Sequence, residues 1–139
     1  MTHITALKPV SALAAALLLA TAGATATTPT TSAMDARMVH YAPYTKAAYD
    51  AAKGMKRVLF FHATWCPNCK AANADIVKNL GNIPADVVIF KADYDKEVAL
   101  KKQYGITSQH SFVLVDDSGK ALKKWAGGKL STIISKTKD

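Results

Sequence analysis

The two cysteines of this chain, Cys66 and Cys69, are separated by two residues and lie where one hydrophobic pattern gives way to another. Residues 57–62 form a β-branched and aromatic run, which predicts a buried strand. Residues 70–80 carry apolar side chains at helical spacing, which predicts a helix with Gly81 as its C-cap. A Cys-x-x-Cys motif at a strand-to-helix turn constrains both the local fold and its chemistry.

This position predicts a dithiol redox site with Cys66 and Cys69 as the catalytic residues. The unpaired N–H groups and the dipole at a helix N-terminus stabilise a thiolate at Cys66, which we expect to have an exposed sulfur. Cys69 lies one helical turn further along, close enough to attack a mixed disulfide that Cys66 has formed. The pair is therefore expected to exchange disulfides.

Two other uses of the cysteine pair are weaker. A structural disulfide across two intervening residues would contribute only about 2 kcal/mol by the chain-entropy estimate. A closed zinc site needs four ligands, and the sequence has neither a second Cys-x-x-Cys motif nor a clustered histidine pair.

The N-terminal segment predicts export. Residues 10–20 are small and apolar apart from Ser11, too short to span a bilayer but typical of the core of a signal peptide. We expect residues 1–26 to be a cleaved bacterial signal peptide, with an uncleaved membrane anchor as the alternative. Residues 27–37, rich in Thr, Pro and Ser, are expected to form a flexible leader. The mature protein would then be periplasmic or secreted, without stable membrane insertion.

Residues 38–139 are expected to form one domain and to act as a monomer. The chain has a net charge of +8, but its lysines are scattered and do not alternate with aromatic residues. This distribution indicates a solvated basic surface, so we expect no nucleic-acid partner.

The hydrophobic periodicity predicts alternating helices and strands in an α/β fold with a central mixed sheet. Asp95 is expected to cap the third helix and Gly105 to end it. The expected helices are residues 44–53, 70–80, 96–104 and 130–135, and the expected strands are residues 57–62, 87–92, 112–115 and 121–125.

From about residue 38 to residue 138 the chain resembles the thioredoxin-fold family, in particular its small exported members. The resemblance rests on residues 61–70, 91–95 and 104–106 and on the Gly127-Gly128 pair before the last helix. It implies a thioredoxin-like fold and thiol–disulfide exchange with protein substrates and with a redox-recycling partner. It implies no cofactor beyond the Cys66–Cys69 disulfide and no metal.

Three features depart from the family pattern, and one of them is the dipeptide Pro67-Asn68 between the cysteines. Phe60 stands where thioredoxin has a buried carboxylate that takes the proton of the second cysteine, and its lysine neighbour is retained as Lys91. His110 stands where the family has a cis-proline. A cis peptide bond before a residue other than proline costs about 3 kcal/mol, so we expect a rearranged loop here. Proline at this position is expected to return the loop to the shape it has in the family.

The resemblance also implies a substrate-binding rim around the cysteines, formed by Trp65, Pro67, Asn68, Gln109 and His110. His110 is expected to act as a base, a thiolate partner or a metal ligand, or to have no chemical role. The leading hypothesis is an exported thiol–disulfide oxidoreductase. The alternative is a metal- or iron–sulfur-binding protein that uses Cys66, Cys69 and His110.

Overall fold

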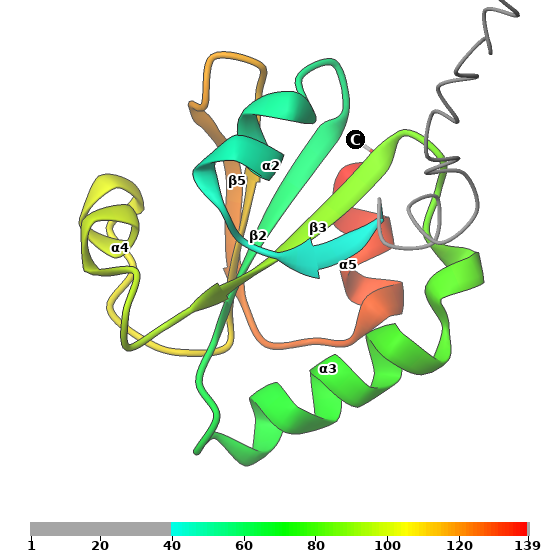
Figure 1. Cartoon of the computed structure of the whole chain (residues 1–139). Helices are drawn as coiled ribbons and strands as arrows, with labels where there is room; N and C mark the ends of the chain where they lie inside the picture. Colours follow the sequence, from blue (N-terminus) through cyan, green and yellow to red (C-terminus); the bar gives the residue numbers. More distant parts are fainter. Residues whose placement is uncertain (1–39, 139) are drawn as a thin grey trace, which may run out of the picture. The chain divides into compact units, whose positions relative to one another are not determined.

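A computed structural model describes residues 40–138, so the predicted signal peptide (residues 1–26) and leader (residues 27–37) lie outside the described residues. The helices and strands follow one another in an alternating order (Figure 1). They are β1 (Tyr41–Pro43), α2 (Lys46–Ala51), β2 (Lys56–His62), α3 (Pro67–Lys78), the 3₁₀ turn η1 (Leu80–Asn82), β3 (Val87–Asp93), α4 (Val98–Tyr104), β4 (Ser111–Val115), β5 (Ala121–Ala126) and α5 (Leu130–Thr137).

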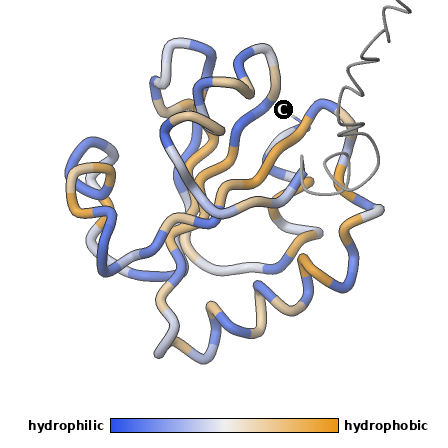
Figure 2. The backbone as a smooth tube through the Cα atoms, viewed as in Figure 1, coloured by the Kyte–Doolittle hydropathy of each residue, from blue (hydrophilic) through white to orange (hydrophobic). Residues whose placement is uncertain are grey.

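These strands form one mixed sheet in the order β1-β3-β2-β4-β5. The pairs β1–β3 and β3–β2 are parallel, and β2–β4 and β4–β5 are antiparallel. Helices α3 and α5 cover one face of the sheet over one buried cluster, and α2 and α4 cover the other face over a second. The inner strands β3, β2 and β4 are buried along most of their length, as strands covered on both faces must be, and β3 is strongly hydrophobic in Figure 2. No helix within residues 40–138 is long and apolar enough to cross a membrane.

The predicted fold class and the order of the predicted elements are confirmed, but the first strand was missed. Strand β1 has only three residues and ends in Pro43, too short a run for an alternating pattern. Its place is fixed by its partner, because Tyr41 pairs with Ile89 of β3.

The two predicted caps were wrong. Helix α3 ends at Lys78 with Asn79 as its C-cap, and Gly81 lies in the following 3₁₀ turn. Helix α4 begins only at Val98, and the carboxylate that binds free backbone N–H groups before it belongs to Asp93, not Asp95. Gly105 ends α4 in the left-handed conformation, as predicted.

Candidate active site

The cysteines lie at the turn between β2 and α3. Cys66 is the N-cap of α3, and Pro67 occupies the first helical turn, where its missing N–H leaves no bond unmade. The Cys66 sulfur accepts a hydrogen bond of 3.3 Å from the backbone N–H of Cys69. Both residues are free thiols. Contrary to our expectation, Cys66 is only 4% exposed, while Cys69 is completely buried.

The two thiols have pKa values shifted in opposite directions. Burial opposes ionisation of Cys66, but hydrogen bonds from the Cys69 thiol, from the N–H groups of Cys69 and Asn68 and from the Gln109 side chain together lower its pKa. Burial raises the pKa of Cys69 to about 11, helped by the hydrogen bond to Cys66 and by its charge. The backbone N–H groups of Ala63 and His110 only partly offset this effect. Cys66 is therefore the thiol that ionises first.

This asymmetry predicts the pH dependence of alkylation. In the reduced, folded protein Cys66 should react with iodoacetamide along a titration curve whose midpoint lies below that of an ordinary thiol. Cys69 should remain unmodified until the protein is unfolded. Peptide mass spectrometry after timed alkylation measures both, and modification of Cys69 before Cys66 would contradict the assignment.

The exposed part of the predicted rim lies around Cys66. Trp65 is 56% exposed, and its indole N–H donates to Asp95 Oδ2 at 3.0 Å. The rings of Trp65 and Tyr94 also pack edge to face, with their centroids 6.5 Å apart. Pro67 and Asn68 are exposed at the start of α3. The Asp95 contact explains why this carboxylate does not cap α4.

His110 has a left-handed backbone, with a φ of 58°. Its N–H donates to the carbonyl of Phe61, and its own carbonyl accepts from the N–H of Gly127. Its ring Nε2 lies 3.1 Å from the carbonyl oxygen of Gly128. Proline is restricted to φ near −65° and has no N–H, so the expectation that proline would fit here was wrong. The left-handed backbone of His110 therefore differs from the one that a proline would take at this position.

Phe60 belongs to the same buried cluster as both cysteines. Its ring stacks on Phe112 at 4.6 Å, and Phe112 stacks on Trp125 at 5.4 Å. Two imidazoles also contact the Phe60 ring, His62 at 5.5 Å and His110 at 6.1 Å between centroids. Apolar and aromatic side chains thus fill the space beside the dithiol, at the position where thioredoxin has a buried carboxylate.

Lys91 on β3 is paired with Phe60 on β2, as the resemblance to the family implied. Its ammonium group donates to Asn73 Oδ1 at 3.3 Å and lies 6.0 Å from the centre of the Tyr41 ring. Tyr41 donates to the same amide oxygen at 2.7 Å. Within residues 40–138, Lys91 has no carboxylate within ion-pair distance.

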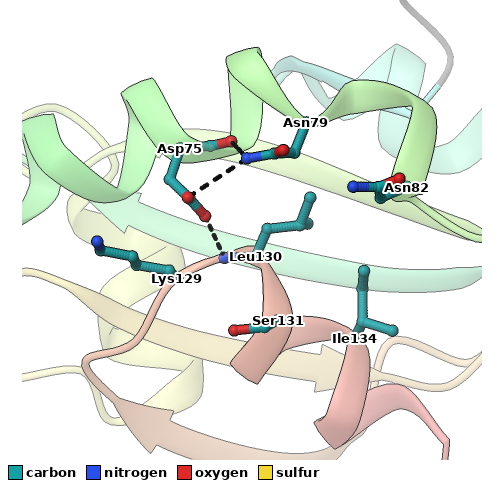
Figure 3. A pocket seen from close by; sticks show the side chains of 7 residues that line it. All are labelled: Asp75, Asn79, Asn82, Lys129, Leu130, Ser131 and Ile134. Carbon is teal, nitrogen blue, oxygen red and sulfur yellow. Dashed lines mark hydrogen bonds between the residues drawn. The ribbon is translucent and has the colours of Figure 1, made fainter.

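Asp75 is a residue that the sequence reasoning missed. It reaches from α3 to the start of α5, where its Oδ2 accepts from the N–H of Leu130 at 2.9 Å (Figure 3). Asn79 donates to the backbone carbonyl of Asp75 at 2.8 Å. Because the Gly127-Gly128 segment leads directly into α5, this contact helps to fix the loop that holds His110. Spacing within α3 gives no sign of it, since the partner is 55 residues away.

The structure does not favour a metal site. No group of three or more His, Cys, Asp or Glu side chains in the described part of the chain is arranged to hold a metal ion. The His110 ring is turned toward Gly128, and its Nε2 is hydrogen-bonded to the Gly128 carbonyl. The donor set proposed for the metal-binding alternative is therefore not assembled.

Comparison with known proteins agrees with this site. Residues 41–139 match the Thioredoxin family model. Thioredoxin-1 of Drosophila melanogaster is 30% identical over 90 residues, which cover 63% of this chain and 83% of that protein. Mitochondrial Thioredoxin-3 of Saccharomyces cerevisiae is 32% identical over 84 residues, or 60% of this chain and 65% of that protein.

A solved structure of similar shape is that of Trxlp from Edwardsiella tarda. It superposes with a TM-score of 0.58 at 25% identity, covering 70% of this chain and 96% of that one. The family match includes β2, the Cys-x-x-Cys turn and α3, the elements that form the site described above. The chain therefore belongs to the thioredoxin family of thiol–disulfide oxidoreductases.

Proposed function

We propose that this protein exchanges disulfides with protein thiols through Cys66 as the attacking residue and Cys69 as the resolving residue. The Cys66 thiolate attacks a substrate disulfide, forms a mixed disulfide and releases one substrate thiolate. Cys69 then loses its proton and attacks the Cys66 sulfur, which releases the second substrate thiolate. Two electrons pass from the dithiol to the substrate, and the Cys66–Cys69 disulfide remains. The reverse sequence oxidises a substrate dithiol.

The observation that carries this assignment is the different setting of the two sulfurs. The Cys66 sulfur caps α3 and accepts a hydrogen bond from the backbone N–H of Cys69, whereas the Cys69 side chain is fully buried. Trp65 precedes Cys66 in the sequence. The Gln109 side chain is hydrogen-bonded to Cys66, and the backbone of His110 is hydrogen-bonded to Cys69. These residues are therefore suited to hold a substrate chain. The substrate-binding role of Trp65, Pro67, Asn68, Gln109 and His110 is part of the proposal.

Trapping of mixed disulfides tests the two roles. Cys69→Ser should accumulate covalent complexes with substrate proteins, because the first attack proceeds and the second cannot. Cys66→Ser should accumulate none, although it keeps the other cysteine and serves as the matched control. Non-reducing electrophoresis of both variants with and without dithiothreitol measures the complexes. More complexes with Cys66→Ser than with Cys69→Ser would reverse the roles.

We also propose that the protein works outside the bacterial cytoplasm, as a monomer that a separate partner protein reduces or oxidises. The support is the small, apolar segment at residues 10–20 followed by small residues before position 27. Expression of the full chain in a bacterium, followed by fractionation and N-terminal sequencing, tests export. Recovery of uncleaved chain from the cytoplasm would contradict it.

A further inference from the structure

Resolution of the mixed disulfide requires a group that accepts the proton of Cys69. The Cys69 thiol is fully buried and its pKa is raised, so few molecules carry a thiolate there at neutral pH. Phe60, which lies on β2 in the same buried cluster as Cys69, cannot accept a proton. The acceptor must therefore come from elsewhere around this cluster.

His62 is the best placed candidate. It lies two residues after Phe60 on β2, so both side chains project from the same face of the sheet, the face covered by α3. The two rings meet edge to face, with their centroids 5.5 Å apart and their planes at 89°. Among the described residues the His62 ring has no hydrogen bond to another residue, and it is half-buried at the end of the strand. It therefore faces both the core beside the dithiol and the solvent.

The charges around His62 keep its imidazole available as a base. Burial, followed by the positive charge of Lys91 on β3, lowers the His62 pKa below its ordinary value. A hydrogen bond from the ring to its own backbone and the charge of Asp93, the partner of His62 on β3, act in the opposite direction, and His110 from the loop before β4 adds to the lowering. The ring is consequently neutral at pH 7, with a free nitrogen lone pair.

We propose that His62 accepts the proton of Cys69, through a solvent water, when the mixed disulfide is resolved. The Cys69 S–H bond breaks and its proton passes to the imidazole. The Cys69 sulfur then forms a bond to the Cys66 sulfur, and the bond from Cys66 to the substrate sulfur breaks. The substrate sulfur leaves with the electron pair and takes up a proton from His62 or from solvent. This inference rests on the exchange chemistry proposed above.

The other nearby basic groups are less suited to this step. The Nε2 of His110 is engaged by the Gly128 carbonyl, and the loop holds its ring against Phe112. Lys91 is directed away from the dithiol, because its side-chain nitrogen donates to the amide oxygen of Asn73. Its contribution is the positive charge that keeps His62 neutral.

The test is a single-turnover reaction of the reduced full chain with dithiobis(nitrobenzoate). Formation of the mixed disulfide releases one coloured thiolate, and its resolution by Cys69 releases the second. In His62→Gln we expect the first release at the wild-type rate and the second slowed roughly 10²-fold at pH 7, the usual scale of general-base catalysis. Circular dichroism of the variant reports that it is folded, and the absence of the first release in wild type would refute the proposed function itself.

The pH profile separates proton acceptance from a structural effect. In wild type the second release should slow only as pH falls through the lowered His62 pKa and stay level above it. In His62→Gln it should rise steadily with pH as the buried Cys69 thiol ionises, because burial raises the pKa of that thiol. In His62→Ala, added imidazole should restore the second release.

A matched control removes another histidine. His40→Gln loses an imidazole that is hydrogen-bonded to the Val87 carbonyl at the other end of β3. It should leave the second release within about twofold of wild type, far from the loss in His62→Gln. An unchanged second release in His62→Gln, or an equal loss in His40→Gln, would overturn the inference.

Discussion

His110→Pro is expected to destabilise the protein by about 3 kcal/mol, whatever it does to activity. The native φ of 58° is closed to proline, and the substitution removes the N–H that donates to the buried carbonyl of Phe61. It also removes the ring that bonds to Gly128 and packs on Phe60 and Phe112. Urea denaturation followed by circular dichroism gives the change in the free energy of unfolding.

His110→Gly is the matched control for this substitution. Glycine adopts a positive φ without strain and keeps the N–H, so it loses only the contacts of the imidazole. We expect it to cost clearly less than His110→Pro, roughly 1–2 kcal/mol. Equal stability of the proline variant and wild type would contradict the left-handed backbone at this position.

Phe60→Asp is expected to cost at least about 4 kcal/mol at pH 7. The substitution removes a fully buried ring that stacks on Phe112 and places a carboxylate in the same cluster as the cysteines. Lys91 lies opposite on β3, but a buried pair seldom recovers its desolvation cost. Thermal and urea unfolding of this variant measure the loss.

The pH dependence identifies the charge as a cause of this loss. Burial raises the pKa of the introduced carboxyl above its unfolded value of about 3.9. The cost of the charge is therefore absent below that pH and grows as pH rises toward the folded pKa. Phe60→Leu, which removes the ring without a charge, should cost roughly 1–2 kcal/mol at every pH. A loss in Phe60→Asp that is equal at pH 4 and pH 7 would contradict this explanation.

The longer elements could be predicted from sequence because each buries a periodic apolar face. The run that became β2 is almost continuously buried, and the Cys-x-x-Cys motif with Pro67 located the start of α3. The end of α3 and the start of α4 could not be predicted, because several polar residues stood close to each of them, whereas Gly105 marked the end of α4. Asp93 and Asp95 were equivalent by spacing, and a contact with Trp65 from another part of the chain decided between them.

The candidate site could be predicted only where its residues are adjacent in sequence. The Cys66–Cys69 pair, Trp65, Pro67 and Asn68 follow from the motif, whereas only the resemblance to the family implied that Gln109 and His110 lie near it. The conformation of His110 depends on Gly127 and Gly128, and the identity of a base near Cys69 depends on how Phe60 and His62 share one face of β2. Both are tertiary relations, which hydrophobic periodicity does not encode.

The central claim is that Cys66 and Cys69 form one dithiol–disulfide couple, and an equilibrium titration against glutathione tests it most directly. Full-length protein is equilibrated over a series of reduced-to-oxidised glutathione ratios, quenched by alkylation and analysed by intact mass. We predict a single two-electron transition, with a tenfold change in equilibrium constant per about 30 mV, between the dithiol and an intramolecular disulfide. A protein that remains doubly alkylated throughout, or that accumulates only a glutathione adduct, would contradict the account.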